Sequence, residues 1–545
     1  MESSRSTCGF GGRCLGCSLA IAVAWIVAGG LPVAAATCES LSQLSLPAAA
    51  ITSAQSVPAG SFTPPNAKPI ENLPAFCRVT GVLKPSADSH IEFEVWLPAS
   101  GWNGKLQGVG NGGFAGSIDY GGAGLSGAVS RGYAAAATDT GHRGSGIDAS
   151  WALGHPEKIV DFGYRAIHET AVKAKAIVTA FYGSGPKRAY FSSCSNGGRQ
   201  ALMEAQRYPE DYDGIIAGAP ANYWTHLMAG FLWNSQATVS DAKAYIPARK
   251  LAALQAATLA ACDALDGVSD GVIDDPSRCR FDPARLLCQG EETDACLTAP
   301  QIGALRKIYS GPLTSKGERL FPGYLPGGEA GPGGWSAWIT GAAPKGSLQF
   351  MFGTQCFANM VAGNAAWDYT AFDVDEGTQA ADSRIGSVLN AIDPDLSHFR
   401  ARGGKLILYH GWSDAAIAPI NSIDYYKSAV AQAGRKQADT FLRLFMIPGM
   451  QHCGGGPGPD VFGQFGAAQG DAGHDMGRAL ELWVEEGAAP DRIIATKFKA
   501  GTPAVPLRTR PVCRYPEVAQ WTKGGSTDDA ANFACGVPVA VKTGK

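Results

Sequence analysis

The 545-residue sequence predicts an α/β protein whose mostly parallel sheet is interrupted by a long insertion. Short β-branched or apolar runs alternate with segments that carry apolar residues at helical spacing. The alternation stops near residue 220 and returns near residue 400. Hydrophobic residues make up 45% and charged residues 17%, and the 70 glycines and 33 prolines are typical of a loop-rich globular enzyme. A net charge of −3 without a Lys/Arg block gives no indication of a nucleic-acid partner.

Residues 1–36 are expected to be a secretory signal and not part of the fold. Two arginines precede an apolar stretch over residues 15–33, and residues 34–36 (AAA) form a small-residue cleavage site. A membrane anchor is the alternative, because this stretch approaches the ~20 residues that a bilayer requires. A lipoprotein attached through Cys38 is another, although Thr37 fits poorly before a lipidated cysteine. The cleaved protein is expected to be secreted or periplasmic, with no membrane attachment.

Cysteine usage also indicates export. Three of the 14 cysteines lie in the signal, and the odd number that remains predicts a disulfide framework with one thiol left over. The sequence does not fix the connectivity, but spacing favours Cys262 with Cys279, Cys288 with Cys296, and Cys513 with Cys535, with Cys38 and Cys77 as a further candidate pair. Cys356 is then the expected free thiol.

Three segments make up the expected mature chain. Residues 37–220 form the first part of the core, with strands over 91–97, 105–109, 133–138 and 188–192 and helices over 162–182 and 197–207. Residues 400–545 form its second part, with strands over 405–409 and 440–446. Residues 221–399 hold cysteine-rich and acidic turns and a Gly/Pro-dense tract. Such an insertion at the edge of a sheet commonly forms a lid over the active site.

The strongest local signal is residues 190–200 (YFSSCSNGGRQ), which read as a strand, a small-residue turn and a helix. This is the context of a nucleophile elbow, with Ser195 as the nucleophile, and it predicts an α/β-hydrolase core. The backbone N–H of Asn196 at the helix N-terminus could stabilise an oxyanion. Gly112 or Gly113, in a glycine-rich loop after an early strand, could supply a second donor. A βα loop with capping serines would fit the same motif.

Partners for this serine follow in the order that hydrolases of this fold use. Asp414 comes just past the strand at 405–409, and His452 lies on a glycine-rich loop after the strand at 440–446. His452 would take the proton of Ser195 Oγ, and Asp414 would orient the imidazole. His410 is the rival base, but only His452 follows the acid in the chain. Two further histidines could border the pocket: His142 and His226.

Cys194 and Cys453 each stand beside a member of this predicted triad. A disulfide between them would close a very long loop, which the chain-entropy model values on the order of 5 kcal/mol. It would also pin the turn of Ser195 to the loop of His452. Two separate buried thiols would be unusual in an exported chain.

Residues 262–274 (CDALDGVSDGVID) concentrate carboxylates in a glycine-containing turn. Ca²⁺ takes six to eight oxygen ligands, and glycines let the chain curl round the ion. The spacing resembles half an EF-hand but lacks the glutamate at the twelfth position. A solvated acidic turn is the alternative.

Cys194-Ser195, Asp414 and His452-Cys453 together resemble the "CS-D-HC" signature of the tannase and feruloyl esterase family. The elements at 102–104 (WNG), 110–114 (GNGGF) and 263–272 are also similar to that family. The resemblance implies a secreted serine esterase with an α/β-hydrolase core, a large lid and a disulfide between Cys194 and Cys453. It also implies a structural calcium ion in the lid, with the ligands Asp263, Asp266 and Asp270 and the carbonyls of Val268 and Val272.

The resemblance implies aromatic acid esters as substrates: feruloyl or galloyl esters or, in a bacterial branch, mono(hydroxyethyl) terephthalate. That branch holds the substrate's carboxylate with a lid arginine. This sequence has no arginine between Arg319 and Arg384, where Lys345 is the one strong cation. An ammonium group binds a carboxylate less well than a guanidinium group, which can form two parallel hydrogen bonds. We therefore expect neutral phenolic esters, feruloyl ahead of galloyl. The acyl ring is expected to meet lid aromatics such as Trp224, Phe350, Phe352 or Phe357. A peptidase on the same core and an inactive polyphenol- or carbohydrate-binding module are the alternatives.

Overall fold

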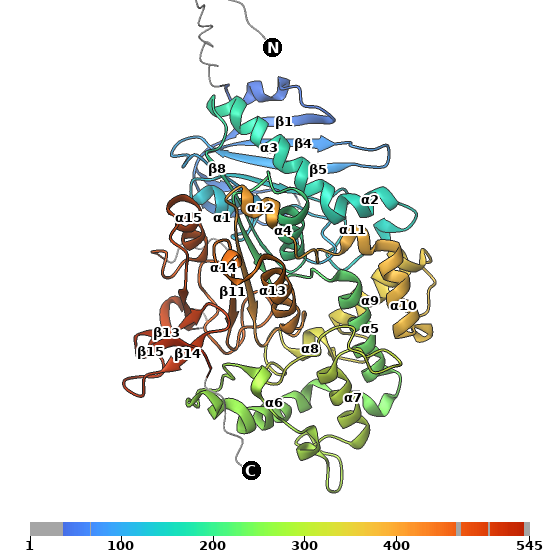
Figure 1. The fold of residues 1–545 in the computed structure, drawn as a ribbon. Helices are drawn as coiled ribbons and strands as arrows, with labels where there is room; N and C mark the ends of the chain where they lie inside the picture. The colour runs from blue at the N-terminus through green and yellow to red at the C-terminus, as the bar shows by residue number, and fades with distance from the viewer. Residues whose placement is uncertain (1–35, 66, 465–469, 500–501, 539–545) are drawn as a thin grey trace, which may run out of the picture. The chain divides into compact units, whose positions relative to one another are not determined.

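The computed structural model describes residues 36–65, 67–464, 470–499 and 502–538, and these described residues fall in one unit (Figure 1). The predicted signal lies outside the described residues except for Ala36, so it stays a prediction. Within the described ranges, no helix has the length and apolar character needed to cross a bilayer.

A nine-stranded mixed sheet, in the order β1-β4-β5-β7-β6-β8-β9-β10-β11, forms the centre of the core. The strands pair in parallel from β7 to β11, whereas β1, β4 and β5 add antiparallel strands at the other side. The strands of this sheet are β1 Ala49–Val57, β4 Phe76–Leu83, β5 Ile91–Pro98, β6 Lys105–Val109, β7 Ala134–Thr138, β8 Arg188–Cys194, β9 Gly214–Gly218, β10 Lys405–Gly411 and β11 Leu442–Ile447. The α/β-hydrolase fold predicted from the sequence is therefore confirmed.

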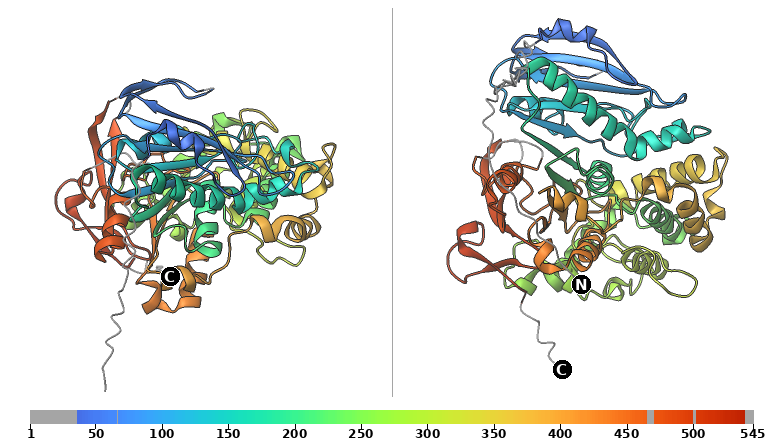
Figure 2. Two further views of the ribbon diagram at one scale, coloured as in Figure 1. Left: turned by 90° about the horizontal axis from the view of Figure 1, so that it is seen from above. Right: turned by 45° about the horizontal axis from the view of Figure 1, so that its top comes forward.

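Helices cover both faces of this sheet, because each presents an apolar stripe to it. Residues of α3, α4 and α13 share one hydrophobic cluster with the sheet, and residues of α1 and α15 share a second one. Figure 2 shows these layers from two further directions. The core helices are α1 Leu125–Ser130, α2 Pro156–Val160, α3 Ala166–Tyr182, α4 Asn196–Arg207, α13 Ile420–Ala433, α14 Arg435–Ala438 and α15 Met476–Glu486.

The insertion, residues 221–399, connects β9 to the region before β10 and adds no strand to the large sheet within the described residues. Its buried residues form a third cluster that also includes Phe114, Phe162 and residues 415–418 of the core. The insertion therefore packs on the loops at the carboxyl ends of the strands. Its helices are α5 Trp224–Val239, α6 Ala248–Cys262, α7 Ala299–Ser310, α8 Trp335–Trp338, α9 Leu348–Cys356, α10 Val374–Ala381 and α11 Ser387–Leu389, and the short α12 Ser397–Ala401 leads into the core.

Three strands of the large sheet were missed by sequence reasoning, for physical reasons. β1 is an edge strand with polar residues on its exposed positions, and β9 is a five-residue apolar run too short to separate from a buried helix segment. The third missed strand, β4, lies between β1 and β5 and pairs antiparallel with both. Two-stranded ribbons complete the structure: β2 Gly60–Phe62 with β3 Ile70–Leu73, β12 Arg492–Lys499 with β13 Thr502–Cys513, and β14 Val518–Trp521 with β15 Phe533–Gly536.

Candidate active site

Ser195 stands on a sharp turn between β8 and α4. Its backbone has φ 66° and ψ −126°, a conformation that is strained for any residue with a Cβ atom. A Cβ atom at Gly197 would lie 1.9 Å from Ser193 Oγ, so only glycine lets the helix start this close to the strand. The predicted nucleophile elbow is therefore present in the structure.

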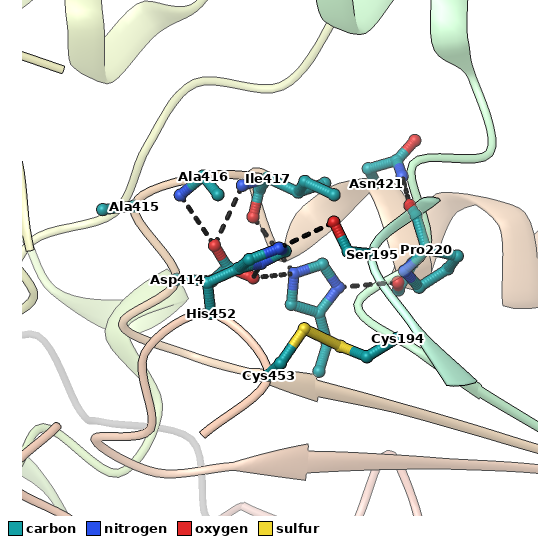
Figure 3. Close-up of polar contacts among 12 residues, drawn as sticks. Cys194, Ser195, Pro220, Asp414, Ala415, Ala416, Ile417, Asn421, His452 and Cys453 are labelled. Carbon is teal, nitrogen blue, oxygen red and sulfur yellow. Dashed lines mark hydrogen bonds and ion pairs between the residues drawn. A yellow bond between two sulfur atoms is a disulfide. The ribbon is translucent and has the colours of Figure 1, made fainter. Parts of the chain in front are cut away.

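Ser195, His452 and Asp414 meet at the carboxyl ends of β8, β11 and β10 (Figure 3). His452 Nε2 lies 2.9 Å from Ser195 Oγ, and His452 Nδ1 lies 2.8 Å from Asp414 Oδ2. A carboxylate only accepts hydrogen bonds, so Nδ1 carries the proton and Nε2 is free to accept one from the serine. The arrangement suits a serine whose proton is taken by a histidine.

Asp414 is buried and held from several sides. Its Oδ1 accepts hydrogen bonds from the backbone N–H groups of Ala416 (2.7 Å) and Ile417 (2.9 Å). Its Oδ2 also faces His410 Nε2 at 3.1 Å. Burial on its own would raise the pKa of Asp414, but the facing imidazoles of His452 and His410 outweigh it and hold the pKa below its ordinary value. The carboxylate is therefore ionised when His452 accepts a proton.

His410, the rival base, is fully buried beside this carboxylate. Its Nδ1 lies 2.7 Å from Ser422 Oγ, and its Nε2 also lies 3.0 Å from the carbonyl of Ile417. Nε2 faces two acceptors, so it carries the proton. His410 thus supports the acid, while His452 faces the serine.

The disulfide between Cys194 and Cys453 lies directly against this group (Figure 3). It links residues 259 apart in the chain, with their Cα atoms 6.0 Å from each other. The other predicted pairs are also present: Cys38–Cys77, Cys262–Cys279, Cys288–Cys296 and Cys513–Cys535. Cys356 is the free cysteine among the described residues, and it is buried. Because Cys38 is bonded to Cys77, it has no free thiol for a lipid.

The predicted oxyanion donors differ in how the structure places them. Asn196 is the first residue of α4, so its N–H has no acceptor within the helix. Asn196 and Gly113 both line the cavity beside Ser195, whereas Gly112 lines a second cavity on the other side. Gly113 has φ 55°, and a Cβ atom there would lie 2.1 Å from the carbonyl oxygen of Gly146. The turn therefore requires glycine at position 113, and Gly113 is the better placed of the two glycines.

An apolar cavity opens beside Ser195 and His452. Among the described residues, the wall has the hydrogen-bonding side chains of Ser195, Asn196 and His452. The insertion supplies Ala221, Trp224, Leu227, Met228, Phe231, Trp338 and Phe352, and the core adds Ala416 and Ile417. Trp224, Leu227, Met228 and Phe231 follow the i, i+3, i+4, i+7 spacing of one helix face, a signal that the sequence offered and that was missed.

Two of the expected pocket aromatics lie elsewhere. Phe350 packs edge-on against Tyr369, with ring centroids 5.0 Å apart, and Phe357 packs against Trp367 and Phe372. Phe350 and Phe352 are two residues apart on α9, so they point to different sides of the helix, and only Phe352 reaches the cavity.

Neither His142 nor His226, which could have bordered the pocket, lines the cavity. His142 Nε2 lies 2.7 Å from the carbonyl of Phe114, and its ring stacks on Trp151. His226 lies between the carbonyl of Leu320 and the carboxylate of Asp382. These contacts hold both histidines away from the pocket.

A second cavity meets the first one at Ser195. Both cavities are lined by Gly113, Ser195, Trp338 and His452. The second one is more polar, since its wall also includes Asn111, Asp119, Ser192, Ser193 and Gln464. An ester bond at Ser195 would thus have an apolar side and a polar side.

The acidic loop has donors of the right chemistry for calcium. Gly267 (φ 90°) and Gly271 (φ 80°) turn the chain so that Asp263 accepts the N–H of Gly271 and Asp266 accepts the N–H of Val268. Burial and the nearby Asp270 raise the pKa of Asp266, so a cation there would be favoured.

The spacing of these carboxylates is wider than a shared ion requires. Asp270 Oδ2 already faces Arg510 at 2.5 Å and Arg508 at 3.1 Å. In the part of the chain that the structure describes, only one trio of metal-ligand side chains lies within 4.8 Å of one another, namely His168, Glu204 and Asp211. Asp263, Asp266 and Asp270 would have to draw together to ligate one ion.

Comparison with known proteins agrees with the geometry. Residues 77–536 match the family model described as "Tannase and feruloyl esterase". An uncharacterized esterase of Xanthomonas campestris pv. campestris is 48% identical over 92% of this chain and 91% of its own length. The mono(2-hydroxyethyl) terephthalate hydrolase of Piscinibacter sakaiensis is 34% identical over 86% of this chain and 85% of its own.

The crystal structure of feruloyl esterase B from Aspergillus oryzae superposes with a TM-score of 0.84 at 30% identity, and the match covers 91% of this chain and 99% of that one. The match of the family model extends over most of the described residues, from β4 of the core through the insertion to the C-terminal ribbons. The protein is therefore a carboxylic ester hydrolase that belongs to the tannase and feruloyl esterase family.

Proposed function

We propose that the protein hydrolyses neutral esters of hydroxycinnamic acids, such as feruloyl esters, through an acyl-enzyme on Ser195. His452 is the general base and Asp414 its orienting acid. The hydrogen-bonded chain from Ser195 Oγ through both nitrogens of His452 to Asp414 supports these roles.

In the first half-reaction, Ser195 Oγ attacks the ester carbonyl carbon while its proton passes to His452 Nε2. The carbonyl oxygen becomes an oxyanion, which the N–H groups of Asn196 and Gly113 stabilise. When the C–O bond to the alcohol breaks, His452 returns the proton to the leaving oxygen. Water then attacks the acyl-enzyme by the same route, and the acid and free Ser195 result.

The apolar cavity beside Ser195 is the observation that carries the substrate proposal. Trp224, Phe231 and Phe352 offer aromatic surface for a planar ring. A feruloyl ring, with one hydroxyl and one methoxy group, suits this wall better than a galloyl ring, whose three hydroxyls would be buried with few partners. The alcohol would leave through the polar second cavity.

A terephthalate monoester is disfavoured because it carries a carboxylate. Lys345 is not part of the cavity wall, and its ammonium lies over the ring of Tyr369 at 5.3 Å. Within the described part of the chain, no lysine or arginine lines the apolar cavity. A buried carboxylate without a cationic partner would be strongly destabilised there.

A panel of three esters tests the proposal: methyl ferulate, methyl gallate and mono(2-hydroxyethyl) terephthalate. We expect kcat/KM to fall in that order, with turnover of all three lost in Ser195→Ala. Turnover of the terephthalate monoester at a rate comparable to methyl ferulate would overturn the ranking. Hydrolysis of methyl ferulate by Ser195→Ala at the wild-type rate would overturn the mechanism.

We also propose that the protein is exported and that its acidic loop binds a structural calcium ion. Five disulfides need an oxidising compartment to form and persist, which supports export. The ligands of the ion would be the side chains of Asp263, Asp266 and Asp270 and the carbonyls of Val268 and Val272. The oxygen-only donor set supports calcium, and the ion would offset the repulsion among the carboxylates.

A further inference from the structure

One turn of the insertion, Gly327–Glu329, touches the loops that carry both Asp414 and His452. Gln451 Nε2 donates a hydrogen bond to the carbonyl of Gly328 at 3.0 Å, and Ser413 Oγ donates to the carbonyl of Gly327 at 3.4 Å. A Cβ atom at Gly328 would lie 2.5 Å from the carbonyl oxygen of Ser413, so the backbones meet without intervening side chains. Ser413 and Gln451 directly precede Asp414 and His452 in the chain.

The carboxylate of Glu329 holds this turn in shape. The residue is fully buried, and its two oxygens accept the backbone N–H of Gly327 at 2.9 and 3.1 Å. The hydroxyl of Tyr309 donates to it at 2.6 Å, and that of Thr258 at 3.4 Å. In each of these hydrogen bonds the carboxylate is the acceptor, and such a set fits an acceptor-only group. Glu329 therefore joins α6 and α7 of the insertion to the turn.

The backbone of Glu329 reaches the histidine by a second path. Its carbonyl accepts the N–H of Trp335, the first residue of α8, at 3.1 Å. Trp338, the last residue of that helix, sets its ring against the imidazole of His452 with centroids 5.2 Å apart at an interplanar angle of 72°. Trp338 also lines both cavities. One residue of the insertion is thus connected to the acid loop, the base loop and the ring that covers the base.

We propose that Glu329 is a positioning residue of the esterase: its buried carboxylate fixes the Gly327–Gly328 carbonyls against the loops of Asp414 and His452. The proposal rests on the Ser-His-Asp mechanism given above. Glu329 itself touches no reacting atom and acts through Gln451 and Ser413. In Glu329→Gln the side-chain NH₂ would face backbone or hydroxyl donors, so the turn would have to shift away from the two loops.

The test measures kcat and KM for p-nitrophenyl acetate, a substrate too small to depend on the acyl cavity. We expect Glu329→Gln to lower kcat by about 10- to 100-fold, because small displacements of reacting groups have effects of this size, while KM changes little. Asp382→Asn is the matched control, since Asp382 is a carboxylate of the insertion that binds Thr225 and His226 instead. It should keep the wild-type kcat.

A double-mutant cycle separates positioning from a general structural effect. If Glu329 acts through the Gln451 contact, Gln451→Met should also lower kcat, and the effects of Glu329→Gln and Gln451→Met should be clearly less than additive. Additive effects, a folded Glu329→Gln with wild-type kcat, or an equal loss in Asp382→Asn would overturn the proposal. If Glu329→Gln does not fold, a folded Gln451→Met with wild-type kcat would overturn it. Failure of the mechanism itself shows separately, as retained activity in Ser195→Ala.

Discussion

Removal of the Cys194–Cys453 disulfide should lower both stability and turnover. The bridge closes a loop of 259 residues, and the chain-entropy model gives such a loop about 5.5 kcal/mol at 25 °C. Cys288–Cys296 provides a matched control, because it closes a loop of 8 residues and is valued at about 2.5 kcal/mol by the same relation. The double variant Cys194→Ala/Cys453→Ala should therefore lose roughly 3 kcal/mol more than Cys288→Ala/Cys296→Ala.

The two variants should differ even more in activity. Cys194 and Cys453 are adjacent in sequence to Ser195 and His452. Loss of the disulfide would therefore release the two loops that must keep the serine and the histidine at hydrogen-bond distance. We expect kcat for methyl ferulate to fall by about tenfold or more in that variant and to stay unchanged in the control. Urea unfolding followed by fluorescence gives the stabilities, and initial rates give kcat. Equal loss of stability in both variants, or wild-type kcat without the 194–453 bridge, would refute the reasoning.

Three further predictions concern the oxyanion loop and the acidic loop. Gly113→Ala keeps the backbone N–H, but its Cβ would lie 2.1 Å from the carbonyl oxygen of Gly146, so the turn must shift and move that N–H away from the oxyanion. We expect kcat to fall by up to the roughly 10²- to 10³-fold that loss of an oxyanion donor costs. Gly112→Ala, whose Cβ would meet no atom within 4 Å, should lose far less, and similar losses in both would contradict the assignment. Asp274 is buried, and burial together with the nearby Asp266 raises its pKa to about 8. In EDTA the protein should therefore lose stability as pH rises from about 4 to 8, because over this range the unfolded chain has already released the proton that the folded chain still holds. Asp274→Asn should flatten that dependence in urea midpoints, and equal slopes in both proteins would disprove it. Chelation of well-dialysed protein should lower the Tm of the wild type, and re-added Ca²⁺ should restore it. In Asp266→Asn, Ca²⁺ should not restore the Tm. A wild-type Tm that does not change on chelation would end the calcium proposal.

The arrangement of Ser195, Asp414 and His452 could be predicted because each residue stands at a strand end in an order that the fold imposes. Parallel strands bring their carboxyl ends to one edge of the sheet, so three distant segments had to meet there. The cysteine pairs were also accessible, since four of them are local in sequence and the fifth flanks the site. For these features, residue type and chain position carry the spatial information.

The substrate cavity was less accessible from the sequence. Trp338 and Ile417 come from segments whose approach to Ser195 depends on how the insertion folds back, and no periodicity records that. The choice between Phe350 and Phe352 depends on the rotation of α9, which is set by its packing against α5. The wide spacing of Asp263, Asp266 and Asp270 could not be predicted from the sequence either, because Arg508 and Arg510, from a ribbon far along the chain, pair with Asp270.

The triad lies in the core and most of the cavity wall lies in the insertion, and this separation has an evolutionary consequence. In the proposed mechanism, Ser195, Asp414 and His452 lie outside 221–399, whereas most of the wall of the proposed acyl cavity lies inside it. Substitutions within this stretch could change the specificity for the acyl group without changing the hydrolytic reaction. Replacement of the whole insertion by that of a relative would be restricted, because the carbonyls of Gly327 and Gly328 accept hydrogen bonds from the core. A grafted insertion would have to reproduce these contacts for the enzyme to stay active.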